Sequence, residues 1–148
     1  MTDDKLDLIG LSLKEISETL INKDLIQTKE KFRSKQLWHW LYFRGETDFD
    51  KMTTVSKELR KKLKDHFIIR RPKVKSHQIS KDGTQKWLLE LNDGNLIEMV
   101  FIPEENRGTL CVSSQVGCTL NCKFCFTGTQ KLVRNLTSGE IISQLLLA

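Results

Sequence analysis

Residues 111–125 read CVSSQVGCTLNCKFC and hold all four cysteines of the 148-residue chain. Cys118, Cys122 and Cys125 have C-x3-C-x2-C spacing, and Cys111 precedes them. A chain that uses cysteine nowhere else and clusters it in this way is more typical of a metal site than of core packing. The stretch therefore predicts a bound metal.

The composition is ordinary for a globular protein, with 39% hydrophobic and 29% charged residues. No apolar run approaches the roughly 18 to 20 residues that cross a bilayer, and the acidic N-terminus does not resemble a signal peptide. We therefore expect a cytoplasmic protein that does not contact a membrane. In a reducing cytosol, clustered cysteines are more often metal ligands or redox-active thiols than structural disulfides.

The net charge of +5 is concentrated in the N-terminal half of the chain. Residues 56–75 hold nine lysines and arginines but only two acidic residues, Glu58 and Asp65. Such a stretch is either a footprint for a phosphate backbone or the solvated face of a helix, and charge alone leaves both open. The candidate RNA-binding residues in it are Lys57, Arg60, Lys61, Lys64, Arg70 and Arg71.

Residues 1–72 predict a helical domain. Ser12 and Glu15 form a capping box for a first helix that ends near Asn22. A further helix is predicted over residues 56–67, because apolar residues recur there every four positions. These apolar residues are Leu59, Leu63 and Phe67.

Between these two, residues 34–43 predict a helix that stops at Gly45. Its aromatic residues, Trp38, Trp40 and Phe43, are candidates either for the core or for base stacking. An aromatic-rich helix in a small domain usually lies in the core, so we expect this helix to be mostly buried.

Residues 73–103 alternate with period 2 and predict an antiparallel β meander that extends the helical domain. Its strands are expected over residues 74–80, 85–91 and 96–102. Asp82-Gly83 and the run Asn92 to Asn95 supply the tight turns between them. In the last strand Glu98 lies on an otherwise apolar face, which indicates either an exposed edge or a buried acid that acts as a base.

The remaining segment, residues 104–148, predicts a strand over 108–116, the cysteine loop and a helix capped by Thr137 and Glu140. A strand, a loop and an amphipathic helix form the first part of a β/α unit. Such a unit cannot bury its helix without neighbouring strands. We therefore expect the chain to be a truncated part of a longer protein, with an overall α+β fold.

The three clustered thiolates can each hold one iron of a 4Fe-4S cluster and leave the fourth iron open to another ligand. A structural zinc site would instead need four closed ligands, and Cys111 is the sole further cysteine. The alternative is therefore a zinc-dependent RNA-binding module without catalysis, and a small iron–sulfur electron carrier is a third hypothesis.

The C-x3-C-x2-C spacing with Phe124 before the last cysteine resembles the signature of radical S-adenosylmethionine (SAM) enzymes. Further stretches narrow the resemblance to the RlmN and Cfr family, which methylates adenine in ribosomal RNA. They are residues 102–104, 109–118, 134–137, 32–33, 48–49 and 52–53, together with Gln36 and Trp40.

The resemblance implies roles for particular residues. Cys118, Cys122 and Cys125 would hold the 4Fe-4S cluster, whose open iron binds SAM. Glu98 falls at the position of the proton acceptor for adenine C2, which favours the buried-acid interpretation. Cys111 falls at the position of a thiol that forms a transient disulfide with a cysteine beyond the chain end.

For the whole chain, the resemblance implies an RNA-binding accessory domain (1–72), a sheet extension (73–103) and the start of a partial (β/α) barrel (104–148). The implied reaction is C2 methylation of adenine in 23S rRNA and tRNA, with C8 methylation, as in the Cfr branch, as the alternative. The implied partners are these RNAs and an electron donor such as flavodoxin, with a monomeric enzyme. The chain alone is expected to be inactive, because the methyl-carrying cysteine is absent.

Overall fold

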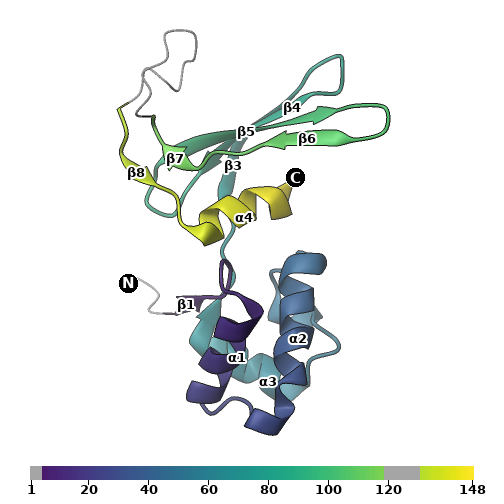
Figure 1. The fold of residues 1–148 in the computed structure, drawn as a ribbon, viewed down its shortest axis with the longest axis vertical. Helices are drawn as coiled ribbons and strands as arrows, with labels where there is room; N and C mark the ends of the chain where they lie inside the picture. The colour runs from purple at the N-terminus through teal and green to yellow at the C-terminus, as the bar shows by residue number, and fades with distance from the viewer. Residues whose placement is uncertain (1–4, 119–130) are drawn as a thin grey trace. The chain divides into compact units, whose positions relative to one another are not determined.

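The computed structural model describes residues 5–118 and 131–148 and combines helices with mainly antiparallel sheet (Figure 1). The chain divides into two compact units, an N-terminal unit, Met1–Arg70, and a C-terminal unit, Arg71–Ala148. Every helix in the described part of the chain is too short or too polar to span a bilayer.

The N-terminal unit is mainly helical, as the sequence predicts. Its elements are β1 (Leu6–Asp7), α1 (Leu13–Asn22), a 3₁₀ turn (Thr28–Glu30), α2 (Phe32–Trp38), a π-helical turn (His39–Phe43), a second 3₁₀ turn (Phe49–Lys51), α3 (Lys57–His66) and β2 (Phe67–Ile68). The capping box of α1 is confirmed, because the backbone N–H groups of Ser12 and Glu15 each donate to the other residue's side chain. The parallel pairing of β1 with β2, which the sequence did not predict, joins the two ends of the unit.

The helix predicted over residues 34–43 exists, but it begins at Phe32 and its last turn is π-helical. The expectation that it would be mostly buried was wrong. Leu37 and Leu41 are buried, whereas Trp38 and Phe43 are 38% and 75% exposed. The reason is that the helix packs chiefly on one side, against α1, which leaves side chains on the opposite side in solvent.

The C-terminal unit contains the predicted meander and a fourth strand. The strands are β3 (Lys73–Ile79), β4 (Gln85–Glu90), β5 (Leu96–Pro103) and β6 (Gly108–Cys111), antiparallel in this order. Gly83 and Gly94 both have φ of +82°, so the two predicted turns use the left-handed conformation that glycine tolerates best. The turn sequences and the period-2 alternation were sufficient to predict this part of the fold.

One face of the meander forms the core of the C-terminal unit. Trp87, Leu89, Ile97 and Met99 point to this face and are at most 7% exposed. The helix α4 (Ser138–Leu147) contributes partly buried apolar side chains to the same core. Burial of one such large side chain stabilises the fold by about 1.5 to 3 kcal/mol, so this face holds the unit together.

The predicted strand over residues 108–116 is divided. After β6 the chain breaks at Val112–Ser114 and continues as β7 (Gln115–Val116), which pairs with β8 (Arg134–Asn135) on the far side of the cysteine loop. The backbone N–H of Val133 donates to the carbonyl of Val116 at 2.9 Å. This pairing closes the loop at its base, and we call the paired segments the loop stem.

Gly117 lies where the loop leaves the stem. Its φ is +75°, and a Cβ atom at this position would lie 2.1 Å from the carbonyl oxygen of Lys131. Two backbone segments approach here more closely than any side chain permits, so the stem requires glycine at this position.

The helix α4 begins at the predicted capping box of Thr137 and Glu140. Its burial differs from the expected apolar pattern, because Ser143 and Gln144 are buried whereas Leu145 is 59% exposed. The cause is a specific contact of Gln144. Its amide oxygen accepts a hydrogen bond from the backbone N–H of Ser113, and its amide nitrogen donates one to the Ser113 carbonyl, both at 2.8 Å. Gln144 therefore binds the backbone of the segment between β6 and β7.

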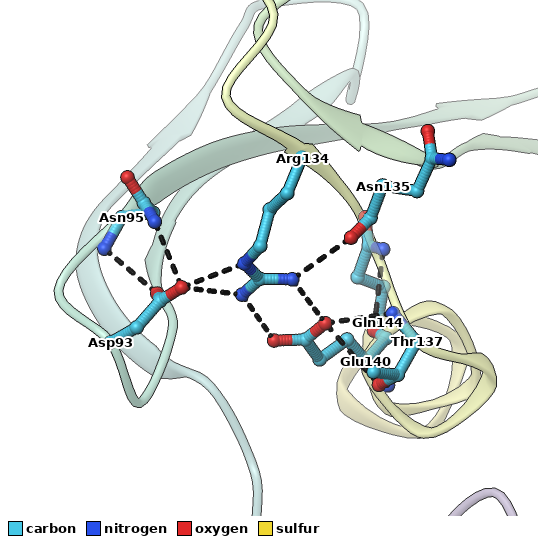
Figure 2. A network of polar contacts seen from close by, with 7 residues as sticks. All are labelled: Asp93, Asn95, Arg134, Asn135, Thr137, Glu140 and Gln144. Atoms are coloured by element: carbon cyan, nitrogen blue, oxygen red, sulfur yellow. Dashed lines mark hydrogen bonds and ion pairs between the residues drawn. The ribbon is translucent and has the colours of Figure 1, made fainter.

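Arg134 connects three parts of the C-terminal unit (Figure 2). Its guanidinium donates to both carboxylate oxygens of Glu140 in α4, at 2.7 and 2.8 Å, and to Asp93 in the β4–β5 turn at 2.7 Å. The hydrogen bonds from Arg134 are the largest cause of the lowered pKa of Glu140. Partial burial opposes this shift, and the hydrogen bond from the Thr137 backbone N–H adds to it. The bidentate ion pair of Arg134 with Glu140 joins the stem to α4, and the contact of Arg134 with Asp93 joins the stem to the meander.

The substitution Gly117→Ala should open the loop stem. The added Cβ would clash with Lys131 and the positive φ would be strained, at a cost of about 2 kcal/mol or more. Amide hydrogen exchange at Val116 and Val133 should accelerate relative to the unaltered chain. Gly94→Ala is the matched control, because it has a positive φ but no atom within 4 Å of the new Cβ. Equal exchange in both variants would contradict the role assigned to Gly117.

The ion pair of Arg134 and Glu140 should make the stability of the C-terminal unit depend on pH. Since the pKa of Glu140 is lowered on folding, its contribution is complete above its ordinary value of 4.5 and is lost as the pH falls through the lowered value. Glu140→Gln retains a capping side chain but not the charge.

We expect the Glu140→Gln variant to be less stable than the unaltered chain by about 1 kcal/mol at pH 7. The difference should shrink towards zero at acid pH. Urea unfolding followed by NMR signals of residues in the C-terminal unit measures it. No difference at either pH would show that Glu140 acts only through the helix cap, which glutamine retains, and a difference independent of pH would exclude a role of its charge.

Candidate functional site

Glu98 lies on the face of the meander that is turned away from the core. Its strand, β5, has neighbours on both sides, so the residue is not at a sheet edge. It is not buried either, because its side chain is 43% exposed and its carboxylate lies 2.8 Å from the ammonium of Lys86. Neither alternative from the sequence is therefore correct, since strand alternation places Glu98 opposite the core face of a central strand.

Cys111 shares this face with Glu98. It is the pairing partner of Val100, two residues along the strand from Glu98, and directly paired residues of antiparallel strands point to the same face. Its thiol is free and exposed. The fold thus brings together two of the predicted site residues that are 13 positions apart in the sequence.

A hollow of about 400 Å³ lies beside Glu98 and the loop stem. Its lining includes Leu88, Leu96, Glu98, Ser113, Gly117 and Lys131. Ser113 connects the two sides, because its hydroxyl donates to the backbone carbonyl of Glu98 at 2.7 Å. A group bound in this hollow would contact both the carboxylate and the base of the cysteine loop.

Of the predicted cluster ligands, Cys118 is half-buried and lies directly after Gly117. Cys122 and Cys125 lie outside the described residues. Three thiolates are the soft donors that an iron–sulfur cluster takes, so the donor set of the loop fits such a group. In residues 5–118 and 131–148 alone, no cluster of three or more metal-ligating side chains is present.

The candidate RNA-binding residues differ in their surroundings. On α3, Lys64 pairs with the carboxylate of Asp50, and the Arg60 guanidinium donates to the Asp50 carbonyl. Lys57 and Lys61 are exposed, and neither has an ion-pair partner among the described residues. Arg70 and Arg71, which follow β2, are half-buried and engaged in contacts. The face of α3 with Lys57 and Lys61 is therefore the part of the basic stretch most open to phosphate.

Two side chains that support the site were not predicted from the sequence. Gln144 fixes the segment between Cys111 and the stem, and Lys86 holds the Glu98 carboxylate. A glutamine among the apolar residues of a helix was a possible signal for the first. No local sequence pattern indicates the role of Lys86, because the ion pair of Lys86 with Glu98 joins two neighbouring strands.

Comparison with protein families gives a match for the N-terminal unit. The family described as "Ribosomal RNA large subunit methyltransferase N-terminal domain" matches residues 6–69, which is most of the N-terminal unit.

Individual relatives match almost the whole chain. The dual-specificity RNA methyltransferase RlmN of Zymomonas mobilis is 57% identical over 146 residues, which cover 99% of this chain and 37% of that protein. The protein of the same description from Sphingopyxis alaskensis is 58% identical, over 97% of this chain and 34% of its own length. The chain therefore spans little more than a third of the relatives it matches.

A solved structure agrees with the sequence matches. The crystal structure of a radical SAM methyltransferase from Sphaerobacter thermophilus has a TM-score of 0.85 and 37% identity, over 97% of this chain and 41% of that one. The mixed helix-and-sheet fold predicted here is thus the fold of a radical SAM methyltransferase over the matched part. Together these matches show that the chain is similar over almost its whole length to part of RlmN-type RNA methyltransferases, with residues 6–69 matching the N-terminal domain family.

Proposed function

We propose that the chain is the N-terminal part of an enzyme that methylates C2 of adenine in 23S rRNA and tRNA. The observation that carries the proposal is the 57% identity to a dual-specificity RNA methyltransferase over 99% of the chain. The C-x3-C-x2-C segment supplies the donor set for the cofactor that this chemistry needs. The relatives reported above have the dual-specificity RlmN description, which favours C2 over C8 methylation.

In this proposal Cys118, Cys122 and Cys125 hold a 4Fe-4S cluster, and SAM binds at its open iron. When bound, the cluster supplies the electron that cleaves SAM to a radical. Gly117 and Lys131, at the base of the cysteine loop, line the hollow. Cys118 directly follows Gly117 and therefore lies next to the hollow. A nearby target base would then reach both the cofactor and the sheet face.

Glu98 is proposed as the acceptor of the proton from adenine C2. A base must be accessible to accept a proton, and the carboxylate of Glu98 is exposed and paired with the ammonium of Lys86. Cys111 is proposed as the thiol that forms a transient disulfide with a cysteine beyond this chain. Its exposed position on the same face allows a second thiol to approach.

The wider organisation is also proposed from the family. Residues 1–72 would be the accessory RNA-binding domain, 73–103 the sheet extension and 104–148 the start of a partial (β/α) barrel. The complete enzyme would act as a cytoplasmic monomer with an electron donor such as flavodoxin.

Anaerobic reconstitution tests the cofactor assignment. With iron and sulfide the chain should become brown and hold about four irons, and the electron paramagnetic resonance signal of the reduced cluster should change when SAM is added. Cys118→Ser should lower the iron content sharply. Cys111→Ser is the matched control and should retain it. A colourless chain that holds one zinc ion would exclude the proposal in favour of a zinc-dependent module.

The basic face of α3 gives a second test. Replacing Lys57 and Lys61 with alanine should weaken RNA binding and reduce the slope of log affinity against log salt by about 2, because each phosphate contact contributes roughly one unit. The control replaces Lys14 and Lys81, which are exposed but lie outside the basic stretch. If both double variants bind alike in a salt titration, the α3 face is only a solvated surface.

A further inference from the structure

A row of exposed side chains follows α2 and its π-helical turn. Phe32, Lys35, His39 and Phe43 recur at spacings of three and four residues and are all exposed, with Phe32 at 52% and Phe43 at 75%. We call these four residues the aromatic stripe. The buried residues of the same helix and its π-helical turn, Ser34, Leu37 and Leu41, do not belong to it. The stripe is therefore not part of the core of the N-terminal unit.

Within the stripe two rings are already stacked. The centroids of the His39 and Phe43 rings are 4.7 Å apart, and the ring planes are inclined by 21°. The pair thus presents a flat apolar surface whose rotamers are restricted before anything binds. A third flat ring that extends the stack would bury exposed area at little further cost in side-chain entropy.

Cations surround these rings. Residues 31–44 contain Lys31, Arg33, Lys35 and Arg44 but no aspartate or glutamate. The guanidinium of Arg33 lies 5.2 Å from the centre of the Phe32 ring and also pairs with Glu30, while that of Arg44 lies 5.9 Å from the Trp40 ring. An apolar protein surface would cover the rings but offer no anionic partner to Lys31, Lys35 and Arg44. A ligand with flat rings and negative charges at short intervals would cover the exposed rings and also pair with the cations.

We propose that the aromatic stripe binds unpaired bases of RNA, with Phe43 as the outer stacking platform and Lys35 and Arg44 next to the flanking phosphates. The inference rests on the proposed function, since it assigns a contact to the RNA substrate. The aromatic stripe would select a different feature of RNA from the one that Lys57 and Lys61 bind. Those lysines attract the phosphates of any RNA, whereas a stacking platform needs a base whose face is not already covered by its neighbours in a helix.

The test measures the affinity of the 148-residue chain for two probes by fluorescence anisotropy. One probe is a labelled, unstructured single-stranded RNA of about 15 nucleotides, and the other is the same strand annealed to its complement. Phe43→Ala should weaken binding of the single strand about 5- to 10-fold, because stacking on one base is worth at least about fivefold in affinity. Binding of the duplex should change less than about twofold.

Two further variants sharpen the test. Phe43→Trp should retain or increase the affinity for the single strand, because the larger ring stacks at least as well. Ile79→Ala is the matched control, since Ile79 is 66% exposed and lies in the other unit. It should bind both probes like the unaltered chain.

Other results would overturn the inference. An unchanged affinity of Phe43→Ala for the single strand, or an equal loss for both probes, excludes base stacking. If Phe43→Ala instead abolishes self-association measured by sedimentation, the stripe binds a second copy of the chain. If only the Lys57 and Lys61 variant loses RNA binding, the proposed function stands and the stripe is excluded. If the unaltered chain binds neither probe, RNA binding by this unit fails as well.

Discussion

The pairing of Gln115–Val116 with Arg134–Asn135 is the constraint on which the C-terminal unit depends. Closing a loop of this length costs roughly 2 to 3 kcal/mol of chain entropy, and these short strands provide few hydrogen bonds to offset it. Gly117 permits the close backbone approach, and Arg134 connects the stem to Asp93 and Glu140. The cysteine loop is therefore held from three sides at its base, next to Cys118, the first of the proposed cluster ligands.

The two faces of the meander separate the core residues from the residues proposed for the chemistry. One face buries Trp87, Leu89 and Met99 and provides the hydrophobic stabilisation of the unit. The other carries Glu98 and Cys111 in an accessible position, beside a hollow that extends to the loop stem. Period-2 alternation makes this division unavoidable, because consecutive residues of β5 must point to opposite faces.

The N-terminal unit carries cations on both α2 and α3, whereas the exposed rings lie on α2 and its π-helical turn. On α3 the buried stripe of Leu59 and Leu63 turns Lys57 and Lys61 into solvent. On α2 the rings of His39 and Phe43 remain exposed among cations. A long polyanion with flat bases offers partners for both surfaces. The physical properties of the unit thus agree with the RNA substrate proposed for the complete enzyme.

The sequence by itself determined the features that depend on neighbours along the chain. These are the capped helices α1 and α4, the turns at Gly83 and Gly94, the period-2 strands and the spacing of the cysteines. Local hydrogen bonds and side-chain periodicity suffice for them.

Only the tertiary structure decided which side chains are covered, since that depends on what lies opposite. It exposed Phe43 and Glu98, buried Gln144 against Ser113, and paired Arg134 with Asp93 at a separation of 41 residues.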